Sequence, residues 1–511
     1  MKLKYKRNNK LQLFITMFFT GTSFAISYLI NFFLAPYITN NIGTDAYGFI
    51  SLARNFANYA MILATALNSY AARYISIEYH RGNIKRSNEY FSSVFYADIF
   101  LTVLIMIVAF FVICFLERLI NIPENLTTDV KALFVFVFIN FAITATGTAF
   151  TAAAYIKNRL DLTGIIKGLS YITEALTIII LFTVFGTKLW FIGVSIAVAA
   201  CVIFASNYIM TRVFTPELRV KQNWFSMNAV KTLVGNGMWS SFNSLGNALN
   251  SGLDLIITNL MISSFSMGQL SYAKTIGTMF STLYQLISQP FQPTFLKKYS
   301  DRDKDGLLRE LRFSMKVSGF ISSVAFAVFF SLGRVYFTLW IPDQDTNLVY
   351  ILTMLTVISC LGEGVICPLY YIYTLTVKIK LPCIITIIGG IMNVGSMFVL
   401  IEYTELGIYA VVLTTAVISS VTNLIFNPLY MAKCLDILWK SFYPAVFRHL
   451  ISCFILAILF YAISCVYMPH NWATLIAEAC VDVIFGLFIH LFVAFDKHER
   501  NRIIAKIREN L

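Results

Sequence analysis

The sequence predicts an all-α polytopic membrane protein with about fourteen transmembrane helices, arranged as two six-helix bundles followed by a C-terminal helix pair. Composition is the first reason. Of the 511 residues, 58% are hydrophobic and only 13% are charged, whereas a soluble protein has about 25% charged residues. Long apolar runs, and Lys and Arg concentrated in alternate connections, are the second and third reasons. This composition excludes a water-soluble multidomain enzyme.

The predicted helices correspond to apolar runs of roughly 20 residues or more, the length that crosses a bilayer. The first run, from Leu11 to Ile38, is too long for a signal-peptide core and lacks a small-residue cleavage pattern, so we expect it to remain as a helix. The runs begin near Leu11, Tyr47, Tyr90, Ala132, Gly164, Leu189, Leu233, Gln269, Ser314, Leu348, Leu381, Gly407, Leu450 and Trp472.

The distribution of basic residues predicts the orientation. With the N-terminus placed inside, most of the 39 Lys and Arg residues fall in the inside connections and the two termini, as the positive-inside rule requires. This predicts an even number of spans with both termini cytoplasmic. The net charge of +13 then reflects topology and not a nucleic-acid partner. The segment from Asp496 to Leu511 reads as a basic amphipathic helix on the anionic inner leaflet.

No catalytic centre is apparent. The predicted outer loops are too short for a folded domain, and the sequence has no phosphate loop and no H-E-x-x-H or G-x-S-x-G motif. Its five His are scattered, and its nine Cys form no C-x-x-C pair. We therefore expect a protein that is not an enzyme and that has no cofactor, with H⁺ or Na⁺ as a candidate coupling ion.

An internal repeat divides the chain. The segment from Gly48 to Arg54 and the segment from Gly268 to Lys274 both fit G-x-x-S-x-A-[RK]. Each lies at the start of a long span, and six predicted helices separate them. An even separation predicts parallel repeats related by an axis along the membrane normal. The predicted domains are residues 1–222, 223–437 and 438–511, the last holding helices 13 and 14 and the basic tail.

The repeat places Arg54 and Lys274 inside spans, where each cation costs about 2.5–3.5 kcal/mol on insertion scales. Such residues normally face a polar cavity, although each could instead snorkel to the nearby membrane surface. Amides on the same helical faces argue for the cavity. Hydroxyl and amide residues also line one face of the first span. The candidate cavity-lining amides are Asn58, Asn68, Asn243, Asn247, Asn250, Gln285 and Gln292.

Polar stripes of this kind have two interpretations. Small polar residues can hold helices together, but packing seldom needs several long amides in succession, so we favour a water-filled cavity. Of the carboxylates within the predicted spans, Asp254 and Glu363 are the preferred coupling-ion ligands because they lie in the half with the longest stripes. Asp98, Glu174 and Asp482 could bind an ion or pair with a neighbour, as Glu174 could with Lys167, two turns away. Other members of the polar stripes are Thr16, Thr20, Ser23, Ser27, Asn31, Thr65, Asn236, Ser240, Thr278, Ser281 and Ser288.

Together with the basic residues in spans two and eight, two early motifs carry a family resemblance. Leu34-Ala-Pro-Tyr-Ile38 is followed by Gly43-Thr-Asp-Ala-Tyr-Gly48, and the pattern resembles the polysaccharide flippases of the multidrug/oligosaccharidyl-lipid/polysaccharide exporter superfamily. The resemblance implies two bundles in a V and export of undecaprenyl-pyrophosphate-linked oligosaccharide across the bacterial cytoplasmic membrane by alternating access. Arg54 and Lys274 match basic residues that line the central cavity of the superfamily's lipid II flippases.

The resemblance also bears on the substrate. The lipid II flippases carry a basic residue within the first span, but the run from Leu11 to Ile38 has none, which favours a capsule, O-antigen or similar repeat unit over a peptidoglycan precursor. Cations in a dry cavity would offset the desolvation of a pyrophosphate, and amides suit sugar hydroxyls. The expected partners are this lipid-linked oligosaccharide, the bilayer and a polysaccharide polymerase with other assembly proteins, and no nucleic acid.

The leading alternative is a cation-coupled multidrug extruder of the same superfamily, which predicts a cavity dominated by carboxylates. An uptake transporter of another fold would show inverted repeats and broken helices. A membrane polymerase would need larger outer loops, and a scaffold protein would leave the paired internal cations unexplained.

Overall fold

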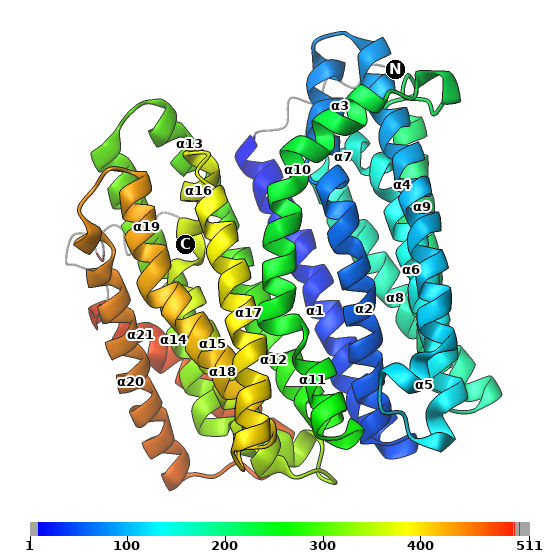
Figure 1. Ribbon diagram of the computed structural model, residues 1–511. Coiled ribbons are helices and arrows are strands. Elements are labelled where there is room, and N and C mark those ends of the chain that lie inside the picture. Colours follow the sequence, from blue (N-terminus) through cyan, green and yellow to red (C-terminus); the bar gives the residue numbers. More distant parts are fainter. Residues whose placement is uncertain (1–8, 494, 496–499, 501–511) are drawn as a thin grey trace. The chain divides into compact units, whose positions relative to one another are not determined.

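The chain is a bundle of helices throughout the part that the structure describes (Figure 1). The computed structural model describes residues 9–493, 495 and 500, and no strand occurs among them. The all-α prediction is confirmed. The predicted amphipathic tail from Asp496 onward lies outside the described residues.

Within the described residues, eleven helical segments are long and apolar enough to cross a membrane, so the chain is a multi-pass membrane protein. A helix also covers or adjoins each of the fourteen predicted positions. The three that are not among the eleven are α2 (Thr44–Asn68), α10 (Met227–Asn247) and α12 (Ser264–Ser288), and each of them carries a polar stripe. The count of fourteen spans therefore stays a prediction. The eleven segments are Ile15–Asn41, Ile84–Cys114, Glu124–Ile156, Leu160–Phe185, Trp190–Phe214, Lys304–Trp340, Thr346–Leu375, Lys380–Tyr403, Ile408–Cys434, Trp439–Val466 and Trp472–His490.

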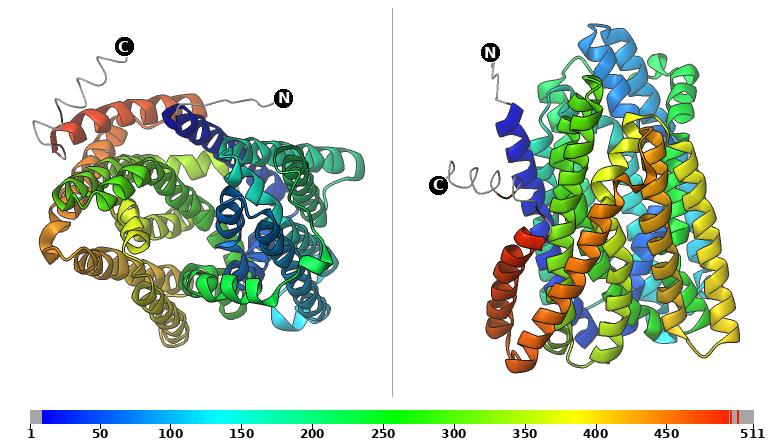
Figure 2. Two further views of the ribbon diagram at one scale, coloured as in Figure 1. Left: turned by 90° about the horizontal axis from the view of Figure 1, so that it is seen from above. Right: turned by 90° about the vertical axis from the view of Figure 1, so that its left-hand side faces the viewer.

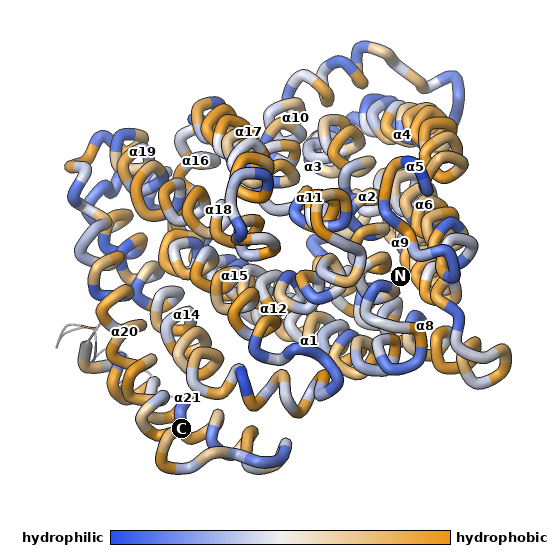
Figure 3. The backbone as a smooth tube through the Cα atoms, turned by 60° about the horizontal axis from the view of Figure 1, so that its bottom comes forward, coloured by the Kyte–Doolittle hydropathy of each residue, from blue (hydrophilic) through white to orange (hydrophobic). Residues whose placement is uncertain are grey.

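The outward faces of the spanning helices are apolar. Phe100 and Phe110 are 73% and 64% exposed, and Phe454 is 69% exposed. Continuous apolar surface of this kind is not tolerated in water, and here it faces the hydrocarbon of the bilayer. Figure 3 shows hydrophobic residues along most of the helices and hydrophilic residues gathered in many of the connections between them.

The chain divides into two compact units, and the first comprises Met1–Ser271 together with Cys383–Gly390. In this unit α1 packs on α8, α6 on α9, and α2 on α10. Figure 2 shows the long helices nearly end-on in its left view. Besides α2, α10 and the start of α12, the helices of this unit are α1 (Asn9–Asn41), α3 (Ala71–His80), α4 (Ile84–Cys114), α5 (Leu116–Leu119), α6 (Thr127–Gly147), α7 (Ala152–Ile156), α8 (Leu160–Phe185), α9 (Trp190–Phe214) and α11 (Asp254–Met261).

The second unit comprises Tyr272–Pro382 and Ile391–Leu511, so α12 and α17 contribute to both units. Helix α14 is central to it and packs on α15, α20 and α21. Its helices, besides the rest of α12, are α13 (Gln292–Ser300), α14 (Lys304–Trp340), α15 (Thr346–Ile366), α16 (Tyr371–Leu375), α17 (Lys380–Tyr403), α18 (Ile408–Val421), α19 (Asn427–Cys434), α20 (Tyr443–Val466) and α21 (Trp472–Val493).

Helices α10 and α11 belong to the same compact unit as the N-terminal helices, whereas the internal repeat predicts a domain boundary after residue 222. The two-bundle boundaries at 222 and 437 therefore remain predictions about the repeat.

Helix boundaries follow local sequence rules. Asn83 begins α4 by accepting a hydrogen bond from the Arg86 amide at 3.2 Å, and Asp303 begins α14 by accepting from the Gly306 amide at 2.8 Å. Such side chains satisfy amides that have no partner within the helix. At the other end, Gly186 terminates α8 with a φ of +79°, a conformation that favours glycine.

The glycines of the repeated motif have a packing role. A Cβ atom on Gly48 would lie 2.9 Å from the backbone nitrogen of Gly268, and one on Gly268 would lie 2.3 Å from the Thr44 oxygen. The N-terminal ends of α2 and α12 can therefore touch only because both positions lack a side chain. The first residue of the motif is thus explained by close backbone approach.

A second close approach joins α2 and α10. A Cβ atom on Gly237 would lie 2.0 Å from the Ala66 oxygen, and the Ser241 hydroxyl donates to the Ile62 oxygen at 2.6 Å. Small residues allow backbones to approach closely in membrane bundles. The contact thus joins α2 and α10 within the first unit through residues that adjoin the polar stripes of the two helices.

Substituting Gly237 by Ala is expected to lower the thermal unfolding temperature of the detergent-purified protein, because overpacking costs about 1–3 kcal/mol. The matched control is Gly235→Ala on the same helix, where an added Cβ meets nothing within 4 Å. There the greater helix propensity of Ala should stabilise by about 0.5–1 kcal/mol. Equal unfolding temperatures for the two variants would contradict the packing assigned to α2 and α10.

Candidate functional site

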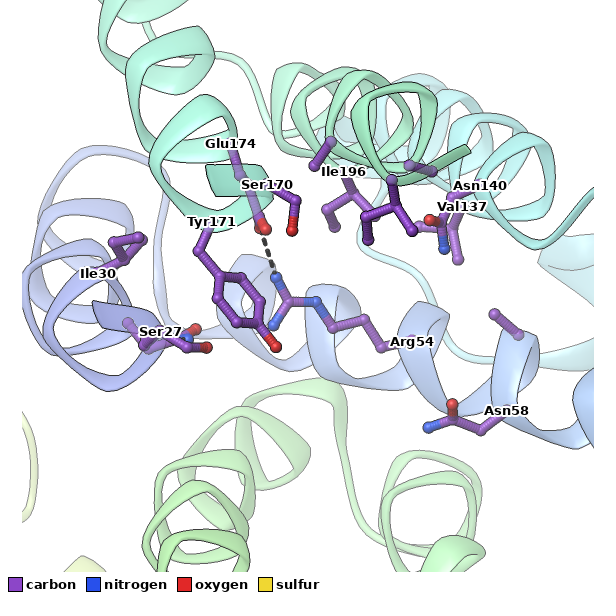
Figure 4. A pocket seen from close by; sticks show the side chains of 15 residues that line it. Ser27, Ile30, Arg54, Asn58, Val137, Asn140, Ser170, Tyr171, Glu174 and Ile196 are labelled. Atoms are coloured by element: carbon purple, nitrogen blue, oxygen red, sulfur yellow. Dashed lines mark hydrogen bonds and ion pairs between the residues drawn. The ribbon is translucent and has the colours of Figure 1, made fainter. Parts of the chain in front are cut away.

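A polar cavity of about 330 Å³ lies inside the first unit, bounded by α1, α2, α6, α8 and α9 (Figure 4). Its walls combine amides, hydroxyls and one ion pair with seven aliphatic side chains. Such groups offer both donors and acceptors to a hydrophilic ligand. The polar residues that line it are Ser27, Asn31, Arg54, Asn58, Asn140, Ser170, Tyr171 and Glu174.

Arg54 extends into this cavity from α2. Its Nη2 atom lies 3.0 Å from Oε1 of Glu174 on α8, and the two side chains are 38% and 12% exposed. In Figure 4 the guanidinium points toward Glu174 across the cavity, with the Tyr171 ring alongside. The arginine therefore lines a cavity, and the predicted face that joins Arg54 to Asn58 is present in the structure. The pair supplies a counter-charge for the Glu174 carboxylate, which is the more buried of the two groups.

The suggested pair between Lys167 and Glu174 is wrong. Lys167 is exposed, whereas Glu174 turns inward to Arg54. Residues seven positions apart are about 10 Å apart along a helix axis, so a partner on a neighbouring helix can lie closer than one on the same helix.

Small residues bring α1 and α8 together beside the cavity. A Cβ atom on Gly164 would lie 3.0 Å from the Thr20 amide nitrogen, and the Ser23 hydroxyl donates to the Gly164 oxygen at 2.5 Å. The stripe on the first span therefore has two roles. Ser23 joins the helices, while Ser27 and Asn31, further along the same face, line the cavity.

The stripe on α2 also divides. Asn58 lines the cavity with Arg54, but Asn68 donates to Oδ1 of Asp98 on α4 at 2.9 Å. Asp98 is fully buried. Asn68 thus contacts a neighbouring helix at the far end of α2.

The α10 stripe is used at least partly for packing. Asn250 donates to the Thr386 oxygen at 2.9 Å, next to a close approach in which a Cβ on Gly246 would lie 2.9 Å from the Thr386 carbonyl carbon. Asn250, in the helical turn that directly follows α10, therefore joins this part of the chain to α17, as the helix-joining interpretation predicts. Asn243 is half-buried and Asn247 is exposed, and neither lines the cavity around Arg54.

Asp254 begins α11 and is fully buried. It follows a π-helical turn, η4 (Ala248–Gly252), whose Gly252 oxygen accepts from both Tyr59 and Asn55 of α2. A π-helical turn of this kind frequently occurs at functional positions. Asp254, one of the carboxylates predicted to bind a coupling ion, thus follows an irregular helical turn that is hydrogen-bonded to α2.

The other predicted site residues belong to the second unit. Ser281 on the α12 stripe donates to Oε2 of Glu363 on α15 at 2.9 Å. Lys274, two turns before Ser281 on α12, is half-buried, as is Gln292, and Gln285 is exposed. A hydroxyl of the α12 stripe is therefore hydrogen-bonded to Glu363, the carboxylate that the sequence analysis favoured as a coupling-ion ligand.

Three polar residues of the cavity were not predicted from the sequence. They are Asn140 on α6, and Ser170 and Tyr171 on α8. Ser170 lies one turn before Glu174, a spacing that could have indicated it, whereas Asn140 and Tyr171 belong to no periodic polar stripe and are identified only by the packing of α6 and α8 around the cavity. Across the residues that the structure describes, no group of three or more His, Cys, Asp or Glu side chains could hold a metal ion.

The family model described as "Polysaccharide biosynthesis protein" matches residues 16–298, more than half of the chain. The chain belongs to the polysaccharide biosynthesis protein family. Over 492 residues it is 26% identical to the uncharacterized membrane protein EpsK of Bacillus subtilis, and the match covers 96% of both chains.

Solved structures of the same fold come from two groups of proteins. The lipid II flippase MurJ, in an inward closed conformation, matches with a TM-score of 0.69 and 14% identity, over 92% of this chain and 98% of MurJ. An inward-facing multidrug resistance transporter of the MATE family, in the MOP superfamily, matches with a TM-score of 0.64 and 13% identity, over 80% of this chain and 96% of that one. The chain therefore has the fold of the MOP superfamily, as the resemblance implied.

The Arg54–Glu174 pair should show energetic coupling in a double-mutant cycle. We expect Arg54→Ala and Glu174→Ala to be each destabilising, and the double variant to be less destabilised than their sum by about 0.5–3 kcal/mol. Thermal or denaturant unfolding of the purified protein measures this. The control pair is Lys131–Glu117, with side chains 30% and 52% exposed, for which coupling below about 1 kcal/mol is expected. Additive effects at Arg54 and Glu174 would be inconsistent with the ion pair.

Proposed function

We propose that this protein is a flippase that exports undecaprenyl-pyrophosphate-linked oligosaccharide repeat units of a capsule, O-antigen or similar polysaccharide by alternating access. The observation that carries the proposal is Arg54, a cation that extends into an amide-lined cavity within the membrane-spanning bundle. Membership of the polysaccharide biosynthesis protein family supports the same substrate class.

The cavity suits both parts of such a headgroup. A guanidinium offers paired N–H donors that match phosphate oxygens. Asn31, Asn58, Asn140 and Tyr171 supply donors and acceptors for sugar hydroxyls. In the proposed cycle the incoming pyrophosphate competes with Glu174 for Arg54, so that the carboxylate holds the arginine in place when no substrate is bound. The lipid tail remains in the bilayer.

The finer assignments extend this proposal. Lys274 is the second pyrophosphate ligand, and Asn68, Asn243, Asn247, Asn250, Gln285 and Gln292 contribute to the substrate path. Asp254 and Glu363 are the candidate sites for H⁺ or Na⁺. The protein would act in the bacterial cytoplasmic membrane with both termini cytoplasmic, alongside a polysaccharide polymerase and other assembly proteins.

A cation-coupled multidrug extruder is the second candidate, and the observation that favours it is Glu174, a carboxylate in the same cavity. The likeness in fold to a multidrug resistance transporter is compatible with it. The ion pair with Arg54 weighs against it because a neutralised carboxylate attracts a cationic drug poorly.

Substituting Arg54 by Ala is expected to abolish surface polysaccharide in a host that depends on this protein, and Lys274→Ala should do the same. Binding of undecaprenyl pyrophosphate to purified Arg54→Ala protein should weaken roughly 10- to 100-fold, since a charged hydrogen bond contributes about 1.5–3 kcal/mol. Arg54→Lys should retain more export than Arg54→Ala if charge matters more than bidentate geometry.

The matched control is Arg73→Ala, because Arg73 is an exposed arginine on α3 and its loss should leave export unchanged. Membrane levels of every variant are measured in parallel. Unimpaired export by Arg54→Ala at normal protein level would overturn the anion role. Efflux of a cationic dye that depends on Glu174 would instead support the multidrug alternative.

A further inference from the structure

The inward face of α21 is built largely from titratable side chains. The buried residues along the described part of this helix recur every three or four positions, which places them on one face. They are Leu475, Glu478, Asp482, Gly486 and His490. The opposite face is apolar and exposed, with Ile484 and Phe485 at 64% and 52%. A helix with lipid on one side thus turns two carboxyl groups toward the protein.

Glu478 and Asp482 are buried carboxyl residues on the inward face of α21. Glu478 is 6% exposed and Asp482 is 0% exposed. Among the described residues, no partner exists for any of their four carboxyl oxygens. Burying an ionised carboxylate without a donor or cation costs several kcal/mol even after relaxation. Two such groups in one site would also repel each other.

Protonation removes both penalties. Positions four apart on a helix hold Cβ atoms about 5–6 Å apart, so the carboxyl groups can meet. A protonated carboxyl supplies one O–H donor, and the second carboxyl of the pair is the acceptor within reach. Carboxyl pairs that share a proton in this way are well known where like charges are close.

The surrounding helices offer no neutralising cation. Gly486 lies against Val324 and Phe460, and Trp472 lies against Tyr336. The pair therefore faces α14 between Val324 and Tyr336, and the last two turns of α20. The one charged residue in those segments is Arg334, which is exposed and lies 5.4 Å from the centre of the Tyr350 ring.

The remaining titratable groups nearby are also directed elsewhere. On α20, Tyr461 and Cys465 are exposed. Further along α21, His490 is two turns from Asp482, and its Nδ1 atom lies 2.5 Å from the Ser452 hydroxyl. Along α21 and the segments facing the pair, no ion pair joins a described side chain to either carboxyl.

We propose that Glu478 and Asp482 form a proton-binding site within the membrane, in which each carboxyl group completes the hydrogen bonding of the other. The bound ligand is H⁺, taken up on a carboxyl oxygen and released to water when the site opens. Proton binding by this pair is independent of the proposed flippase function. A role of the pair as the coupling site for export rests on that function.

The first test is carbodiimide labelling of the full-length protein in liposomes. Dicyclohexylcarbodiimide reacts with protonated carboxyl groups in apolar surroundings, and peptide mass spectrometry locates the adduct. We expect adducts at Glu478 or Asp482 at pH 6–7, with no more than about one per chain, and a decline as the pH rises to 9. Asp161, which is buried but ion-paired with Arg159 at 3.1 Å, is the internal control and should stay unlabelled.

The second test does not depend on reagent access. Above neutral pH the wild-type protein should lose thermal stability, because the pair is forced to ionise while buried. A Glu478→Gln/Asp482→Asn double variant imitates the protonated pair and should lose less over the same range. Parallel pH curves for both proteins, together with absent labelling, would overturn the proposal. Protection from labelling by NaCl but not by choline chloride at constant pH would also overturn it, in favour of a Na⁺ site.

Export measurements separate this proposal from the proposed function. If Arg54→Ala exports normally but the carboxyl pair is labelled and pH-sensitive, the flippase assignment fails and the proton site stands. If Arg54→Ala abolishes export but the pair is neither labelled nor pH-sensitive, the proton site fails and the flippase assignment stands.

Discussion

The ion pair between Arg54 and Glu174 is the interaction on which the first unit's cavity depends. A guanidinium within a membrane-spanning bundle is costly unless a polar cavity and a counter-charge accommodate it, and here Glu174 supplies the counter-charge. The partner comes from α8, not from the helix that carries the arginine, so α2 and α8 must remain adjacent for the charge to be accommodated. A ligand that displaces Glu174 from Arg54 must carry a negative charge that binds the guanidinium at least as strongly. For the proposed function, that requirement favours a pyrophosphate over a cationic or neutral solute.

Close packing through small residues is what allows these polar faces to meet. Gly164 and Ser23 bring α8 against α1, Gly237 brings α10 against α2, and the two motif glycines bring the start of α12 against α2. In each case the absence of a side chain at one position lets a polar neighbour reach a backbone oxygen or lets two backbones touch. The polar residues of one stripe therefore have different roles, which depend on their position along the helix and on the helix that they face. Ser23 and Asn250, beside glycine contacts, join helices, whereas Ser27, Asn31 and Asn58 line the cavity.

This division explains how far the sequence predictions reached. The helical class, the positions of the long helices and the location of Arg54 in a cavity followed from hydropathy and periodicity, because a bilayer enforces both regardless of how helices pack. Asn58, Asn68 and Asn250 looked equivalent in the sequence, yet they line a cavity, contact Asp98 and bind the Thr386 oxygen, respectively. Asn140 and Tyr171 gave no periodic signal at all. Helical periodicity shows which face of its own helix a residue occupies, but not which helix lies opposite that face.

The amino-acid sequence by itself determined that this chain is a helical membrane protein, where its long helices lie, and which of them carry polar faces. These properties depend on the transfer of each side chain between water and hydrocarbon, which is local to the chain. The tertiary structure alone decided that Glu174 pairs with Arg54 instead of Lys167, that Ser281 holds Glu363, and that Glu478 and Asp482 turn away from lipid without a donor. Those outcomes depend on distances of a few ångströms between helices remote in sequence, since hydrogen bonds and ion pairs form only over such distances.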